Sequence, residues 1–238
     1  MPVTATESSV FKVRRFERSV ILLCIGWHLA YNLSLRNLEE MMAERGISVD
    51  HARVHRWVVR YSPELLERFN RRKRAVAGTW HVDETDIKVH GQWRYLSSAI
   101  DSNWDTVEFW FSERRNLTTA KRFLDKTLKR PGRPERVVID GSRTNREAIL
   151  PCDTTDRLQD RSRRKLKPIR IRQRRYLNNR IEQDHRATKR RVRPMLGFKS
   201  MDNARAILGG IEMAHMMRKG QAKFACAPQL SLAEQLVA

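Results

Sequence analysis

Cysteine is scarce in this chain, and long apolar runs are missing. The three cysteines, Cys24, Cys152 and Cys226, are odd in number and far apart, with no Cys-x-x-Cys pair among them. That spacing excludes a disulfide framework, a zinc ribbon and a redox dithiol. The longest apolar run covers residues 20–27, well short of the roughly 20 residues needed to cross a bilayer. We therefore expect a cytoplasmic protein with no membrane partner.

Acidic residues are also few compared with basic ones. The 238 residues include 48 Lys and Arg against 27 Asp and Glu, which gives a formal net charge of +21. A charge of this size repels itself on folding and is typical of proteins that neutralise phosphate groups. Because 40% of the residues are hydrophobic, the chain can bury a core, and general disorder is excluded. The composition predicts a globular protein that binds nucleic acid.

The N-terminal part has the pattern of three short helices. Apolar residues recur every three or four positions over 14–32, Ser34 is placed to cap a second helix, and Asp50 is placed to cap a third. Gly46 lies where the second helix ends and a positive φ is needed, and Pro63 is expected to interrupt the third helix. This is the arrangement of a helix-turn-helix, whose second helix lies in the DNA major groove.

The third predicted helix carries a line of basic residues on its outer face. Arg53, Arg56 and Arg60 are spaced i, i+3 and i+7, so they share one side of the helix. We interpret this line as a DNA contact, and the alternative is the ordinary solvated face of a three-helix bundle. We expect residues 1–70 to form an all-α helix-turn-helix domain, followed by a basic linker at 71–79.

Residues 80–200 have the pattern of an α/β domain. Three strands in a meander are predicted at 80–89, 93–100 and 106–111, followed by a helix at 117–128 and a short buried strand at 136–139. Three antiparallel strands, a crossover helix and a parallel strand form the start of a ribonuclease H-like core. The remaining residues, 201–238, are expected to form a C-terminal helix and tail.

Three acidic residues are placed to converge in this predicted core. Asp83 lies inside the first strand, Asp140 follows the buried strand, and Glu182 falls in a helical stretch from about 177 to 191. Three carboxylates held together repel one another unless divalent cations neutralise them. Their oxygen atoms suit Mg²⁺ or Mn²⁺, and two such ions support an in-line displacement at phosphorus. For any single acid in so polar a chain, an ordinary surface position is the alternative.

Short motifs surround these acids and continue beyond them. They are found at 80–85, 139–141, 178–185, 194–200 and 217–220. Together they resemble the bacterial DDE transposases of the insertion-sequence-six family, over about residues 11–222. The resemblance implies a retroviral integrase-like, ribonuclease H-like catalytic core behind an N-terminal DNA-binding domain. The implied function is to bind the terminal inverted repeats of an insertion sequence and join its 3′ ends to target DNA.

The resemblance also implies residue roles. Asp83, Asp140 and Glu182 would be the catalytic residues and the ligands of Mg²⁺ or Mn²⁺, with two ions expected. The basic residue that the family has seven positions after the glutamate corresponds to Lys189, and the i, i+7 spacing independently places Lys189 on the helix face of Glu182. The partners implied are double-stranded DNA, from element ends and target, and further copies of the chain in a homodimer or higher homo-oligomer on DNA.

Several positions depart from the family pattern. Asp86 stands where an aromatic residue is usual, Ser97 and Ser98 replace a Tyr-Arg pair, and Trp104 replaces a turn glycine. Strand alternation predicts Asp86 on the face opposite Asp83, with a loss of packing in the strand. These differences support an alternative function, a catalytically degenerate copy that only binds DNA through its helix-turn-helix. A structure-specific nuclease on the same core is a third interpretation.

The most basic stretch of the chain lies between the last two acids, from Arg157 to Arg175, and is opposed only by Asp160. We expect it to follow the phosphates of a DNA strand, and the alternative is a disordered charged tract. The DNA-binding residues expected within it are Arg163, Arg164, Lys165, Arg170, Arg172, Arg174 and Arg175.

Overall fold

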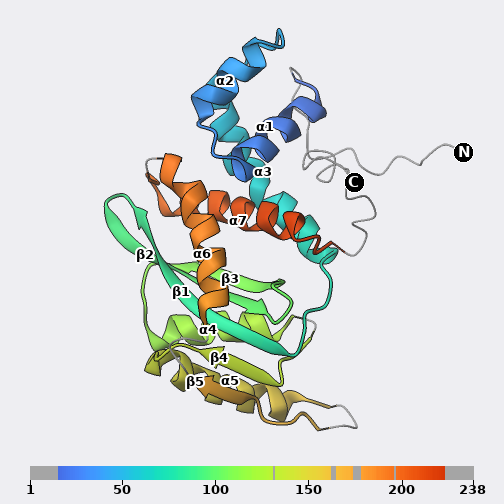
Figure 1. Ribbon diagram of the computed structural model, residues 1–238, viewed down its shortest axis with the longest axis vertical. Coiled ribbons are helices and arrows are strands. Elements are labelled where there is room, and N and C mark those ends of the chain that lie inside the picture. Colours follow the sequence, from blue (N-terminus) through green and yellow to red (C-terminus); the bar gives the residue numbers. More distant parts are fainter. Residues whose placement is uncertain (1–15, 131, 162–164, 174–177, 196, 223–238) are drawn as a thin grey trace, which may run out of the picture.

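The computed structural model describes residues 16–130, 132–161, 165–173, 178–195 and 197–222. Helices α1, α2 and α3 lie together at one end of the molecule, and α7 lies between them and the sheet (Figure 1). No helix in these ranges is both long and apolar enough to cross a membrane.

The three helices predicted for the N-terminal part are present. Helix α1 spans Arg18–Ala30, α2 spans Leu35–Ala43 and α3 spans His51–Arg71. The Ser34 hydroxyl accepts a hydrogen bond from the Asn37 N–H, and the Asp50 carboxylate accepts one from the Arg53 N–H, so both predicted caps are confirmed. Gly46 has the expected positive φ, 71°.

The prediction that Pro63 interrupts the third helix is wrong, because α3 continues through it to Arg71. The buried stripe of α3 extends past the proline through Leu65 and Phe69, which pack in the same core as Trp57. Burial of these large side chains outweighs the roughly 3 kcal/mol by which a proline disfavours a helix interior. A single helix therefore extends from the turn after α2 to the segment that leads into the sheet.

The sheet has five strands in the order β3-β2-β1-β4-β5. Strands β1 (Thr79–Val89), β2 (Gln92–Asp101) and β3 (Thr106–Ser112) form an antiparallel meander, whereas β4 (Arg136–Ile139) and β5 (Arg170–Gln173) run parallel to β1. This mixture and order confirm the ribonuclease H-like topology. The four predicted strands begin and end within about one residue of those observed, but β5 was not predicted.

Helices cover both faces of the sheet. On one face α4 (Leu117–Leu128) and α5 (Arg143–Gln159) pack with Trp80 and Val82 of β1. On the other lie α6 (Asn179–Val192) and α7 (Met201–Arg218), and a short 3-10 helix, η2 (Arg193–Met195), follows α6. Strand β1 contributes to two cores, because Ile87 and Val89 at its far end pack in the same core as the N-terminal helices.

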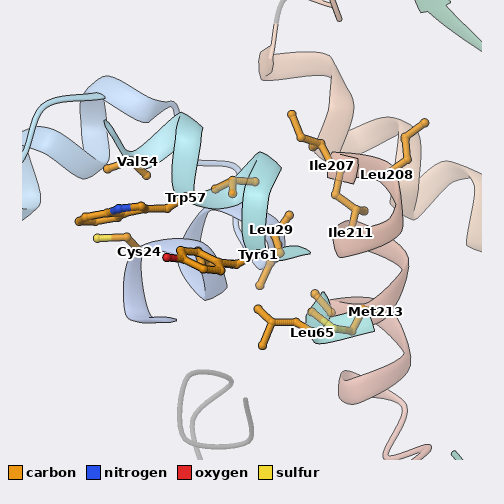
Figure 2. Close-up of a cluster of buried hydrophobic side chains, with 14 of the residues drawn as sticks. Cys24, Leu29, Val54, Trp57, Tyr61, Leu65, Ile207, Leu208, Ile211 and Met213 are labelled. Carbon is orange, nitrogen blue, oxygen red and sulfur yellow. The ribbon is translucent and has the colours of Figure 1, made fainter. Parts of the chain in front are cut away.

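Helix α7 packs directly on the N-terminal helices. Figure 2 shows Ile211 and Met213 of α7 beside Leu29 of α1 and Leu65 of α3, and all four side chains are buried. Gly210 allows the close approach, because a Cβ there would lie 2.7 Å from a methyl carbon of Leu29. The three N-terminal helices and α7 therefore share one apolar core.

Candidate active site

Two of the predicted acids are neighbours because of the strand register. In the parallel pairing of β1 with β4, Val82 lies opposite Ile139. Asp83 and Asp140 are the next residues along the chain, and both are partly buried. Asp140 also accepts a hydrogen bond from the Ser142 N–H at 2.9 Å, in the turn that leads into α5. The register therefore brings the two carboxylates together at the end of β4.

Helix α6 brings Glu182 to the same place. The side-chain amide of Asn178, just before the helix, donates to the Val82 carbonyl oxygen at 3.1 Å, and His185 Nδ1 lies 3.7 Å from Asp83 Oδ2. Glu182 precedes His185 by three residues and so lies one turn away on the helix. Its side chain is 49% exposed, and its carboxylate lies 3.8 Å from the Arg186 guanidinium.

The charges of Asp140 and Glu182 act on Asp83. Burial raises the pKa of Asp83 to about 6, and the charges of Asp140 and Glu182 contribute to the rise, while the Glu84 N–H and the Arg115 guanidinium oppose it. The neighbouring imidazole of His185 is neutral at pH 7, because burial and then the Lys189 ammonium lower its pKa to about 4. The buried part of the site is therefore acidic and holds no histidine countercharge.

This donor set fits a hard divalent cation in its chemistry. The acids offer carboxylate oxygens, which Mg²⁺ and Mn²⁺ prefer, and their mutual repulsion is the kind that a bound cation relieves. Within the described ranges, however, no three acidic, histidine or cysteine side chains form a ready-made metal-binding group. The carboxylates lie near one another without yet surrounding a common point.

Lys189 lies on the exposed side of α6, two turns beyond Glu182. It is close enough to His185 for its charge to lower the pKa of that imidazole. The structure therefore places the predicted basic residue near the carboxylates, on the side of the helix that faces solvent.

The three arginines predicted to contact DNA differ in their surroundings. Arg56 and Arg60 are exposed on α3, and the Arg60 guanidinium lies 5.5 Å from the Tyr61 ring. Arg53 is partly buried, with its guanidinium 5.3 Å from the Phe16 ring and its Nε 3.6 Å from the Asp50 carboxylate. Arg53 is thus held against its own helix cap, whereas Arg56 and Arg60 are accessible.

The basic tract is only partly described. Arg163, Arg164, Arg174 and Arg175 lie outside the described residues. Lys165 is exposed, and Arg170 and Arg172 are exposed on β5, at the edge of the sheet. At the start of the tract, Arg157 pairs with Asp153 at 3.1 Å. Part of the tract therefore belongs to the sheet and presents its arginines to solvent.

The departures from the family pattern leave the acidic site intact. Asp86 is exposed, so the expected loss of packing in β1 does not occur. Ser97 and Ser98 are buried on β2, and the Ser97 hydroxyl donates to the Glu84 carboxylate at 3.2 Å. Trp104 adopts a positive φ of 68°, a conformation that glycine holds without strain.

Sequence patterns did not reveal the polar contacts on the buried side of α6. Asp184 pairs with the Lys219 ammonium, and the Thr188 hydroxyl donates to the buried Glu212 carboxylate at 2.7 Å. Both partners lie on or just after α7. The i, i+4 spacing of Asp184 and Thr188 indicates a shared helix face, but it does not indicate that α7 covers that face.

Comparison with known proteins agrees with the site and the fold. A protein-family model described as "DDE domain" matches residues 77–221. The transposase for insertion sequence-like element IS431mec from Staphylococcus aureus strain Mu50 / ATCC 700699 is 34% identical over 210 residues, 88% of this chain and 88% of the relative. The transposase for insertion sequence element IS257 in transposon Tn4003, also from Staphylococcus aureus, is 33% identical with the same coverage.

The fold, the acidic site and the match to the family model together define a DDE-type polynucleotidyl transferase. More narrowly, the chain belongs to the insertion-sequence-six family of DDE transposases, enzymes of DNA transposition. Among solved structures, the HTLV-2 integrase catalytic core domain in complex with magnesium is similar over 57% of this chain and 86% of its own, at 14% identity and a TM-score of 0.36. The fold assignment rests on the strand order of the sheet.

Proposed function

We propose that the protein binds the terminal inverted repeats of an insertion sequence and joins the 3′ ends of the element to target DNA, using Asp83, Asp140 and Glu182. The observation that carries the proposal is the convergence of these three acids. The β1–β4 register makes two of them neighbours, and the contact of His185 with Asp83 brings the turn that bears Glu182 beside them.

The three carboxylates are proposed to hold Mg²⁺ or Mn²⁺, with two ions as the expected number. When bound, such ions supply activation of the attacking 3′ hydroxyl and stabilisation of the leaving oxygen. Asp83 is on β1, Asp140 directly follows β4, and Glu182 is on a helix whose other face is anchored to α7. The chain therefore holds its oxygen ligands on rigid elements, which favours a defined geometry for the bound ions.

Lys189 is proposed to contact a phosphate of the reacting strand. It is exposed on the helix that bears Glu182, and an ammonium there can hold a phosphate oxygen without neutralising the buried carboxylates. Asn178 and His185 are proposed to position the site, because they join the start of α6 to β1 at Val82 and Asp83.

Recognition of the element ends is assigned to α3, with Arg56 and Arg60 the accessible members of the basic line on the helix that follows the turn. The exposed Lys165, Arg170 and Arg172 are proposed to follow DNA phosphates. Because both ends of an element must be joined, we propose a homodimer or higher homo-oligomer on DNA, acting at the nucleoid in the bacterial cytoplasm. The proposed division of the chain remains 1–70, 71–79, 80–200 and 201–238.

The test uses the full chain, a labelled duplex with the inverted repeat of the element that encodes it, target plasmid and Mg²⁺. Asp83→Asn, Asp140→Asn and Glu182→Gln should each abolish joining while end binding is retained. Asp86→Asn, at an exposed acid of the same strand, is the matched control and should join normally.

Two outcomes would favour the alternatives. End binding without joining by the natural chain would indicate a catalytically degenerate copy. The positive φ of Trp104 is one source of backbone strain in such a copy. Hydrolysis of the duplex without joining would indicate a nuclease. Near-normal joining by any of the three carboxylate variants would contradict the assignment of the acids.

A further inference from the structure

A cavity of 610 Å³ lies between the three N-terminal helices and the segment that follows α6. It is lined by side chains from α1, from the starts of α2 and α3, from η2 and the residues after it, and from α7. Its volume is that of a site for one small ligand. The acidic site lies at the other end of α6, so this cavity is a separate feature.

Two cations and three histidines line the cavity, and none of the described residues that line it is acidic. The cations of the lining are Arg36 and Lys199, and its histidines are His28, His51 and His55. Burial and then the Arg191 charge lower the pKa of His28 to about 3, so its imidazole is neutral at pH 7. Lys199 and His55 approach each other from different elements. Burial lowers the pKa of His55, and the nearby Lys199 ammonium lowers it further. His51 is already paired with the Glu39 carboxylate at 2.8 Å, which leaves Arg36 and Lys199 as the exposed cations of the lining.

A further buried cation lies beside the cavity. The Arg191 side chain at the end of α6 is buried, and its Nη2 lies 3.3 Å from Nδ1 of the lining residue His28 and 3.5 Å from the Leu33 carbonyl oxygen. Its Nε and Nη1 are buried without a hydrogen-bond partner, and in the described part of the chain it forms no ion pair. An unpaired buried charge is costly, and a nearby anion would offset that cost.

Part of the cavity lining is apolar. Leu35, Met195, Phe198 and Ile207 form this part, and the last two are buried. A lining that combines apolar side chains with cationic groups fits a ligand with a flat, weakly polar part and an anionic part. A nucleotide has both, with a base that packs on apolar surface and a phosphate that pairs with lysine or arginine.

We propose that this cavity binds one unpaired nucleotide of the DNA substrate, with its base on the apolar lining residues and its phosphate near Lys199 and Arg36. A duplex is too wide to enter a cavity of 610 Å³, so the nucleotide must leave the stack. The start of α3 lines the cavity and is also the part of a recognition helix that approaches bases, so bound DNA is delivered beside it.

The proposal rests on the proposed recognition of element ends, and its test is independent of joining. Duplexes of the inverted repeat carry 2-aminopurine at successive positions, and fluorescence is measured with the full chain in EDTA. Unstacking of one base should raise its emission severalfold at a single position. Lys199→Ala and Arg36→Ala should each reduce that rise severalfold, whereas Lys129→Ala, at an exposed lysine after α4 and outside the cavity lining, should not.

Affinity measured against salt gives a second readout. Lys199→Ala should make the slope of log affinity against log salt shallower by about 0.7, the value for one phosphate contact on a single strand. No rise in fluorescence at any position would overturn the proposal, and so would a rise that both cavity variants retain. Saturation of the cavity by free deoxyadenosine monophosphate alone would assign it to a free nucleotide and also overturn the proposal. If the natural chain shows the fluorescence rise but does not join ends, the result contradicts the catalytic assignment and supports the cavity proposal.

Discussion

The two ends of α6 hold opposite kinds of unbalanced charge. Glu182 near its start lies with Asp83 and Asp140, and Arg191 near its end lies beside a cavity lined by basic side chains. Glu182 and Arg191 are nine residues apart on α6, which separates the two places by about 14 Å along the helix. Like charges held together lower stability, so each place is better explained by an oppositely charged ligand than by the fold. We therefore expect the acidic end to bind cations and the basic end to bind an anion.

The largest effect is expected when the acidic end alone is changed. Glu182→Gln removes one carboxylate charge from the three, and we expect joining to fall by on the order of a thousandfold, as for the loss of an essential electrostatic contact. End binding should be nearly unchanged. Gln183→Ala, at the next and exposed position of α6, is the matched control for helix content. A large loss in the control would show that α6, rather than the charge, is what joining requires.

The second effect concerns stability at the same end. The pKa of Asp83 is about 6 in the folded protein against an ordinary 3.8, so between these pH values the folded state holds a proton that the unfolded chain has lost. Stability therefore falls as pH rises from about 4 to 6, and the loss is complete above that range. Asp83→Asn removes the charge and should raise the free energy of unfolding by about 1–3 kcal/mol above pH 7.

Urea unfolding at two pH values checks this prediction. Near pH 4 and below, the variant and the natural chain should be almost equally stable, since Asp83 is protonated in the folded state. Added Mg²⁺ should stabilise the natural chain above pH 7 more than it stabilises Asp83→Asn. A variant that is destabilised at both pH values would show that the carboxylate is a structural hydrogen-bonding group.

Removal of a charge at the basic end should have a smaller effect, on affinity for DNA. Arg191→Met keeps much of the length of the side chain and removes a buried charge that has no ion-pair partner in the described ranges. Because such a replacement is often neutral or stabilising, we expect the unfolding free energy to be unchanged or higher. Affinity for the element end should fall about tenfold, or about 1.4 kcal/mol, if an anion binds beside it. A loss of stability with normal affinity would make Arg191 a structural residue.

The smallest effect on DNA binding or joining is expected from a change that tests how α6 is held between its two ends. Thr188→Val removes the hydroxyl that donates to Glu212, whose carboxyl has its pKa raised to about 7 by burial. We expect a destabilisation of about 1–3 kcal/mol and a few-fold slower joining. Thr188→Ser keeps the donor and should restore the joining rate. Equal rates for the two variants would mean that this contact does not position the helix.

The sequence allowed much of this arrangement to be predicted, and the failures have physical causes. Strand alternation, helix periodicity and caps such as Ser34 and Asp50 are local, so β1 to β4 and the N-terminal helices were predictable. The family motifs allowed Asp83, Asp140 and Glu182 to be predicted as the catalytic acids. Strand β5 has only four residues, two of them arginine, and forms because β4 offers a free edge, which is not a local property.

The candidate cavity could not be predicted for a related reason. Arg36, His55 and Lys199 are distant in sequence and come from separate segments. Their shared position depends on how α7 packs on α1 and α3, and that packing depends on side-chain volume and on the close approach at Gly210. Periodicity shows which face of each helix is apolar, but it does not show which helix will cover it.

The packing of α7 on α1 and α3 also governs the order in which the chain can fold. The N-terminal helices are synthesised first, but the buried face that includes Leu29 and Leu65 is covered by a helix that begins only at Met201. A ribosome-bound chain that ends within the sheet therefore presents that face to solvent, where it is open to aggregation and to chaperones. The N-terminal helices become fully packed only after the strands and helix that carry the three acids have been made.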